Sequence, residues 1–135
     1  MTTSETPQYA NPAGLFALPE MLSLSVTVPV PRLVFLSGQV AWNADGELVG
    51  EGDHGAQAAQ IVRNIDIALA AAGTSREHLV KHTIYVAGYR PELAEAILAP
   101  VRAGVTTRPA STLVGVQALF DPRYLVEIDV IAWIP

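Results

Sequence analysis

Residues 106–116 read Thr-Thr-Arg-Pro-Ala-Ser-Thr-Leu-Val-Gly-Val, and residues 126–132 read Val-Glu-Ile-Asp-Val-Ile-Ala. Both runs are rich in β-branched residues and predict the last two strands of the chain, over residues 110–116 and 125–133. Alternate side chains on a strand point to opposite faces, so the last strand presents two sets. One set is Val126, Ile128, Val130 and Ala132, and the other is Glu127, Asp129, Ile131 and Trp133. The first set predicts a helix-covered face, and the second a face that meets other protein.

Working outward, three more strand segments are predicted from alternation and turn residues. Leu22, Leu24, Val26 and Val28 alternate with polar residues, which predicts a half-buried strand over residues 21–28. Further strands are predicted over residues 33–37 and 79–86. Between the strand predicted over residues 33–37 and the first helix, residues 40–42 and 47–49 flank an Asp45-Gly46 turn and predict a hairpin.

Two helices are expected between the strands. The first follows Asp53, a suitable N-cap, carries apolar residues at i, i+3, i+4 and i+7, and ends before Gly73. The second opens at Pro91 and runs to about Arg102. Three amides beside the apolar stripe of the first helix are expected to bond to neighbouring backbone: Gln57, Gln60 and Asn64.

This order of elements predicts an α+β domain, with a mixed sheet and two helices on one face. Residues 1–19 are polar and contain Pro7, Pro12 and Gly14, so we expect a loose N-terminal arm before a domain over residues 20–135. A chain of 135 residues that is 50% hydrophobic and only 16% charged would leave large apolar patches exposed as a monomer. We therefore expect an oligomer.

Composition also excludes several classes of function. The net charge of −5 and the lack of any Lys or Arg run do not favour a nucleic-acid partner. No stretch approaches the roughly 20 apolar residues of a membrane span, and the start does not resemble a signal peptide, so a cytoplasmic protein is expected. The absence of cysteine excludes disulfides, thiolate catalysis and Cys-ligated metals.

Several motifs together resemble the Rid (YjgF) family of small trimeric proteins, some of which hydrolyse reactive enamines and imines. They are Leu36-Ser37-Gly38-Gln39, the amide spacing of the first helix, and the two stretches quoted above, which parallel the family's Pro-Ala-Arg-Ser, alternating valines and Val-Glu-Ile-Glu. The resemblance covers residues 20 to 134. It implies a chorismate-mutase-like fold in which three subunits form a barrel-like core, with three pockets at the subunit boundaries.

The resemblance also implies roles for individual residues. Glu127 corresponds to the family glutamate that positions or activates water, and Ser37 and Gly38 match the Ser-Gly at the pocket edge. The backbone near Leu113 would lie beside a bound carboxylate.

Three pocket positions differ from the family pattern. Ser111 falls where the deaminating members carry arginine, Leu24 where they carry a tyrosine, and Ala96 where they carry an asparagine. A neutral hydroxyl cannot form the bidentate clamp that a guanidinium gives a carboxylate. Arg108 could swing into this space, with an ordinary surface or interface role as the alternative. The polar groups expected to converge in an apolar pocket are Ser37, Ser111, Thr112, Glu127 and Arg108.

These features predict a small-molecule enzyme that acts on an enamine, an imine or a related intermediate. Glu127 would orient water or move a proton, while Ser111 and Thr112 would donate hydrogen bonds. Deamination of 2-imino acids is the less expected reaction because of Ser111. The smaller, more apolar residues at the three positions favour a bulkier or uncharged ligand, as for a specialised pathway enzyme that acts on a larger intermediate. The alternative is a non-catalytic trimer that binds a small molecule or a partner, in which Glu127 is a structural interface carboxylate.

No metal or cofactor is predicted. His78 and His82 have the i, i+4 spacing of a helical metal pair, but in a strand they would lie about 13 Å apart. We expect His82 to be a hydrogen-bonded core or interface residue. Gly-rich phosphate loops and nucleophile motifs are absent from the sequence.

Overall fold

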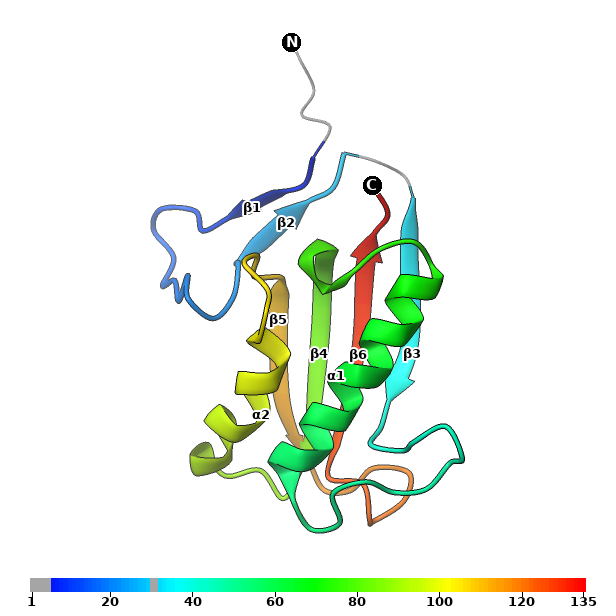
Figure 1. The fold of residues 1–135 in the computed structure, drawn as a ribbon. Helices are drawn as coiled ribbons and strands as arrows, with labels where there is room; N and C mark the ends of the chain where they lie inside the picture. The colour runs from blue at the N-terminus through cyan, green and yellow to red at the C-terminus, as the bar shows by residue number, and fades with distance from the viewer. Residues whose placement is uncertain (1–5, 30–31) are drawn as a thin grey trace.

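The computed structural model describes residues 6–29 and 32–135 (Figure 1). Its main sheet consists of β3 (Leu33–Gln39), β4 (Leu79–Ala87), β5 (Ala110–Val116) and β6 (Val126–Trp133), in the spatial order β3-β6-β4-β5. The helices α1 (His54–Ala71) and α2 (Ala94–Arg102) cover the same face of this sheet. The β3–β6 and β4–β6 pairs are antiparallel, and the β4–β5 pair is parallel. The predicted mixed sheet with two helices on one face is confirmed.

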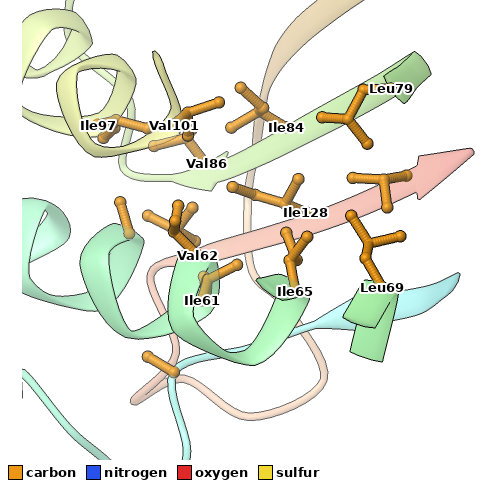
Figure 2. Packing of buried hydrophobic residues seen from close by; sticks show 14 of the residues in the cluster. Ile61, Val62, Ile65, Leu69, Leu79, Ile84, Val86, Ile97, Val101 and Ile128 are labelled. Carbon is orange, nitrogen blue, oxygen red and sulfur yellow. The ribbon is translucent and has the colours of Figure 1, made fainter. Parts of the chain in front are cut away.

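The helix α1 lies against the centre of the sheet because its apolar stripe matches the even-numbered face of β6. Ile61, Ile65 and Leu69 are buried against the sheet, where Ile84 and Ile128 meet them (Figure 2). At 25 cal/mol per Å², burying one such side chain stabilises the fold by about 2 kcal/mol.

Both predicted ends of α1 are confirmed. The Asp53 side chain accepts a hydrogen bond from Ala56 N at 3.0 Å, and Gly73 after the last turn has φ of 86°. That left-handed conformation carries no steric cost for glycine. The second helix begins with the short 3₁₀ turn η2 (Pro91–Leu93), in line with the proline start that the sequence predicts.

The amides of α1 hold two loops at the end of the sheet where β6 begins. The side chain of Gln57 is fully buried; its Nε2 donates to Gly50 O at 3.1 Å and to Arg123 O at 3.0 Å, and its Oε1 accepts from Leu125 N at 2.8 Å. Asn64 Nδ2 donates to Trp42 O at 2.9 Å. These bonds confirm the predicted role of the amides and fix the chain just before Glu127.

The N-terminal part of the chain differs from the sequence prediction. Residues 6–19, the described part of the arm, were expected to contain no regular element, yet β1 (Gln8–Ala10) pairs with β2 (Ser25–Thr27). The hydroxyl of Tyr9 in β1 also donates to Leu79 O at 3.1 Å and so anchors the arm to the domain. The strand predicted over residues 21–28 is shortened to β2, while Ser23 forms an isolated bridge with Ala110 of β5.

Smaller corrections concern β3 and the hairpin. The strand β3 continues through Gly38 to Gln39, with a register shift between Leu36 and Gln39. The predicted hairpin is reduced to one bridge, between Trp42 and Leu48. The 3₁₀ turn η1 (Arg76–His78) leads directly into β4. No helix among the described residues combines the length and the apolar character that crossing a bilayer requires.

The Gln57→Leu variant should lose about 2 to 3 kcal/mol of unfolding free energy, because two carbonyls and one N–H would remain buried without a partner. Urea denaturation followed by circular dichroism measures this change. Gln60→Leu is the matched control, since the Gln60 amide lies at a partly exposed position where water can replace its bonds. Equal losses in the two variants would contradict the assigned role of Gln57.

Candidate functional site

The sheet face turned away from the helices carries most of the predicted polar residues. The register pairs Glu127 with Tyr85 and Asp129 with Thr83 on this side. We call this surface the open face; its residues include Leu33, Phe35, Ser37, Lys81, Thr83, Tyr85, Ala110, Thr112, Val114, Val116, Glu127, Asp129, Ile131 and Trp133. Phe35 is 67% exposed here, so the open face combines carboxylates with uncovered apolar surface.

The Glu127 carboxylate lies directly against Gly38. A methyl group added at Gly38 would stand 2.6 Å from Glu127 Oε2 and 2.8 Å from its Cδ, so only glycine leaves room for this position. Burial, and then the charge of Asp129, raises the pKa of Glu127 above the ordinary glutamate value. The carboxylate therefore keeps a proton to higher pH than an exposed glutamate does.

Tyr85 extends the same polar row. Its hydroxyl donates to Asp129 Oδ2 at 3.4 Å, and the nearby Asp129 charge raises the pKa of Tyr85. Tyr85 thus stays a neutral donor beside two carboxylates.

Ser111 lies on the opposite face of the sheet. The parallel register pairs it with His82, and His82 Nε2 lies 2.6 Å from Ser111 Oγ on the helix side. His82 is only 4% exposed; burial first, and the Lys81 charge second, lower its pKa to about 4. The expected hydrogen-bonded core histidine is confirmed. The expected convergence of Ser111 with Glu127 is not met within one chain, because strand parity separates them.

Arg108 also lies away from the open face. Its guanidinium donates to Glu20 O at 2.7 Å, Val105 O at 2.9 Å and Thr107 O at 3.0 Å. These backbone bonds tie the N-terminal segment to the approach to β5, and the side chain borders a small cavity beside His82. Within one chain, the predicted swing of Arg108 toward Glu127 is therefore replaced by a structural role.

The remaining predicted pocket residues divide between the two faces. Ser37 and Thr112 lie on the open face, and Thr112 Oγ1 accepts from Lys81 Nζ at 2.8 Å. Leu113 packs against the core below the helices, Leu24 follows the bridge to β5, and Ala96 lies on α2 on the helix side. A site that combined the open-face residues with those on the helix side would need more than one chain.

Two open-face residues were missed by sequence reasoning, Lys81 and Tyr85. Their common parity was visible, but the pairing register that aligns them with Glu127 was not. Among residues 6–29 and 32–135, no group of three or more His, Asp or Glu side chains could hold a metal ion. His78 instead pairs with Thr74, its Nδ1 lying 3.1 Å from Thr74 Oγ1.

The buried His82 makes the protein sensitive to acid. Its pKa is about 4 in the fold and 6.5 when unfolded, so the unfolded chain takes up the proton first. Stability should therefore fall as the pH drops from 6.5 to 4, by about 3 kcal/mol in total from this residue.

Urea denaturation of the wild-type protein and of His82→Gln at several pH values tests this. The stability advantage of the wild-type protein over the variant should shrink steadily through that window. Parallel pH profiles would show that His82 does not titrate as its burial implies.

Comparison with known proteins agrees with this geometry. A sequence model of the family described as endoribonuclease L-PSP matches residues 18–134. The chain is similar to a RutC family protein of Aquifex aeolicus, at 34% identity over 134 residues that cover 98% of each chain. It is also similar to protein HMF1 of Saccharomyces cerevisiae, at 34% identity over 119 residues that cover 88% of each.

A solved structure shows the same fold. YyfB of Yersinia pestis, described as a protein of unknown function of the conserved Rid family, aligns with a TM-score of 0.89 and 34% identity. The alignment covers 96% of this chain and 99% of that one. With its motifs, its fold and these relatives in agreement, the chain belongs to the Rid (YjgF) family, whose sequence model is the one described as endoribonuclease L-PSP.

Proposed function

We propose that this protein is a small-molecule enzyme that acts on an enamine, an imine or a related carbonyl intermediate. The observation that supports this most directly is the environment of the Glu127 carboxylate. This group is half-buried on the open face and lies against Gly38, and its pKa is above the ordinary glutamate value. A carboxylate with a raised pKa is suited to accept and return a proton nearer neutral pH. Structural carboxylates are usually neutralised by a partner, and no ion pair is found for Glu127 within the described residues.

The chemistry follows from this single group. Hydrolysis of an imine requires water to add to the imine carbon while a base takes the water proton. The same group, now protonated, passes that proton to the imine nitrogen. It then moves the proton of the new hydroxyl group to the same nitrogen, so that the C–N bond breaks, ammonia leaves and a carbonyl forms. Glu127 would perform these proton transfers. Tyr85 and Asp129, which are bonded to each other, would form the polar surroundings of Glu127 along the sheet.

The pocket would be completed by a second copy of the chain. One chain places Glu127, Gly38 and Thr112 on the open face and Ser111 on the other, so no single chain encloses a ligand. Exposed Phe35 and Leu33 on the open face also favour burial against further protein. The homotrimer with its open faces turned inward, as the family resemblance implies, would satisfy both features.

RNA cleavage is not part of this proposal, although the family description mentions an endoribonuclease. The chain has a net charge of −5, and the open face carries two carboxylates per chain. Such a surface repels the phosphate backbone instead of neutralising it.

The second candidate is a trimer that binds a small molecule or a partner without catalysis. The bond between Ser111 and His82 favours it, because the residue at the family's arginine position points into the protein. Arg108 is likewise held by backbone carbonyls. Binding of a small molecule by a protein that does not convert it would distinguish this candidate from the enzyme.

Glu127→Gln should reduce the release of ammonia from freshly generated 2-iminopropionate by about a hundredfold or more, because the variant cannot accept the water proton. The matched control is Glu92→Gln, an exposed glutamate of η2 on the helix side, which should retain full activity. Analytical ultracentrifugation of both variants checks that assembly is unchanged. Wild-type turnover no faster than buffer would exclude 2-imino acids as substrates, and binding of a small molecule without its conversion would support the binding protein.

Gly38→Ala should fold normally but lower the turnover by about tenfold or more, since the added methyl group displaces a carboxylate that must stay within reach of its water. Thermal unfolding and steady-state kinetics measure the two effects separately. Unchanged kinetics in Gly38→Ala would refute the catalytic position of Glu127.

In the wild-type protein, the acidic limb of the pH–rate profile should lie above the ordinary glutamate range, because the pKa of Glu127 is raised.

A further inference from the structure

The open face carries one cation among the outward-pointing residues of its four described strands, and that cation is Lys81. We infer that Lys81 and Thr112 together form a binding site for a small organic carboxylate. The inference deepens the proposed function, on which it rests for the ligand's role as a substrate. It concerns binding, however, and can be tested without turnover.

The geometry leaves two hydrogen-bond donors side by side. Lys81 Nζ donates to Thr112 Oγ1 at 2.8 Å, with a second and longer contact of 3.5 Å to His82 O. An ammonium has three N–H donors, and a hydroxyl that accepts one bond still has its own proton to donate. A carboxylate placed beside the pair can therefore accept from both Lys81 and Thr112.

The charge of Lys81 is not neutralised by the described part of the chain. The ion pairs found there join Arg76 to Asp66, Arg102 to Glu95 and Arg123 to Asp121. Within one chain Lys81 is only partly buried and Thr112 is exposed, so the chain itself leaves both donors uncovered for a ligand in a pocket between copies. Charge-assisted hydrogen bonds to carboxylates are the stronger kind, which gives such a ligand a clear preference over a neutral one.

The other candidates for this role are occupied elsewhere. Arg108 donates from Nε and Nη1 to three backbone carbonyls, and these bonds hold its guanidinium away from the open face. Ser111, the neighbour of Thr112, bonds to His82 on the opposite face. Lys81 is thus the cation that shares a face with Glu127.

Lys81 and Glu127 of one chain are nevertheless separated along the sheet. Lys81 stands opposite Ile131 on β6, whereas Glu127 stands opposite Tyr85, four residues further along β4. At the rise of a strand this distance is about 13 Å, too long for one small ligand to bridge. A substrate held by Lys81 would therefore be acted on by Glu127 of a second copy, and carboxylate binding itself would not require Glu127.

Isobutyrate and its neutral isostere isobutyramide are suitable probes, titrated into the full-length protein and followed by backbone amide chemical shifts. Lys81→Met should weaken isobutyrate binding by about tenfold or more, the equivalent of one charge-assisted hydrogen bond, and leave isobutyramide unaffected. Thr112→Val should also weaken the binding of isobutyrate. Lys81→Arg, which keeps the charge, should retain most of the affinity for isobutyrate. This control shows that the loss in Lys81→Met comes from the missing charge and not from misfolding.

Arg108→Met is the competing variant and should bind isobutyrate like the wild-type protein. The inference is overturned if wild-type protein shifts no resonances near Lys81 with millimolar isobutyrate, if Lys81→Met binds as tightly as wild type, or if Arg108→Met alone loses binding. Glu127→Gln separates the two proposals, because it should lose turnover and keep isobutyrate affinity. Lys81-dependent binding without turnover would therefore refute the proposed function alone, and Glu127-dependent turnover with Lys81-independent binding would refute this inference alone.

Discussion

The packing of α1 on the even-numbered face of β6 is the constraint on which the rest of the structure depends. Ile61, Ile65 and Leu69 of the helix bury Ile128 and its neighbours, and this turns every odd-numbered side chain of β6 away from the helices. A shift of one residue would exchange the two faces and bury two carboxylates, which is energetically prohibitive. The position of Glu127 on the open face is thus a consequence of apolar burial on the other side.

The same parity rule divides the chemistry of the molecule. On the helix side it gives a neutral, buried His82 bonded to Ser111; on the open face it gives Lys81 with Thr112. These two pairs come from adjacent residues of the same two strands. Strand pairing alone therefore decides that one pair stabilises the interior and that the other remains available to a ligand.

An acidic open face with one cation has consequences for what the protein can bind. It disfavours polyanions and suits a small, singly charged molecule that meets Lys81 at one end and a proton-transferring carboxylate at another. The exposed Phe35 on the same face favours an assembly in which chains cover one another. A pocket shared between copies unites these features, since the two functional ends of the open face lie too far apart in one chain.

The sequence by itself determined the elements of the main sheet, the two helices, the face of β6 that packs on α1 and the backbone role of Gln57, because these depend on local periodicity and capping. It misjudged the N-terminal segment, where Tyr9 anchors a strand by a bond to Leu79, 70 residues away. It also expected Ser111 and Arg108 to converge with Glu127, and within one chain neither residue shares the face of Glu127. Only the tertiary structure decided this, because the register between β4, β5 and β6 depends on long-range hydrogen bonds, and a single step of register sends a side chain to the opposite side of the sheet.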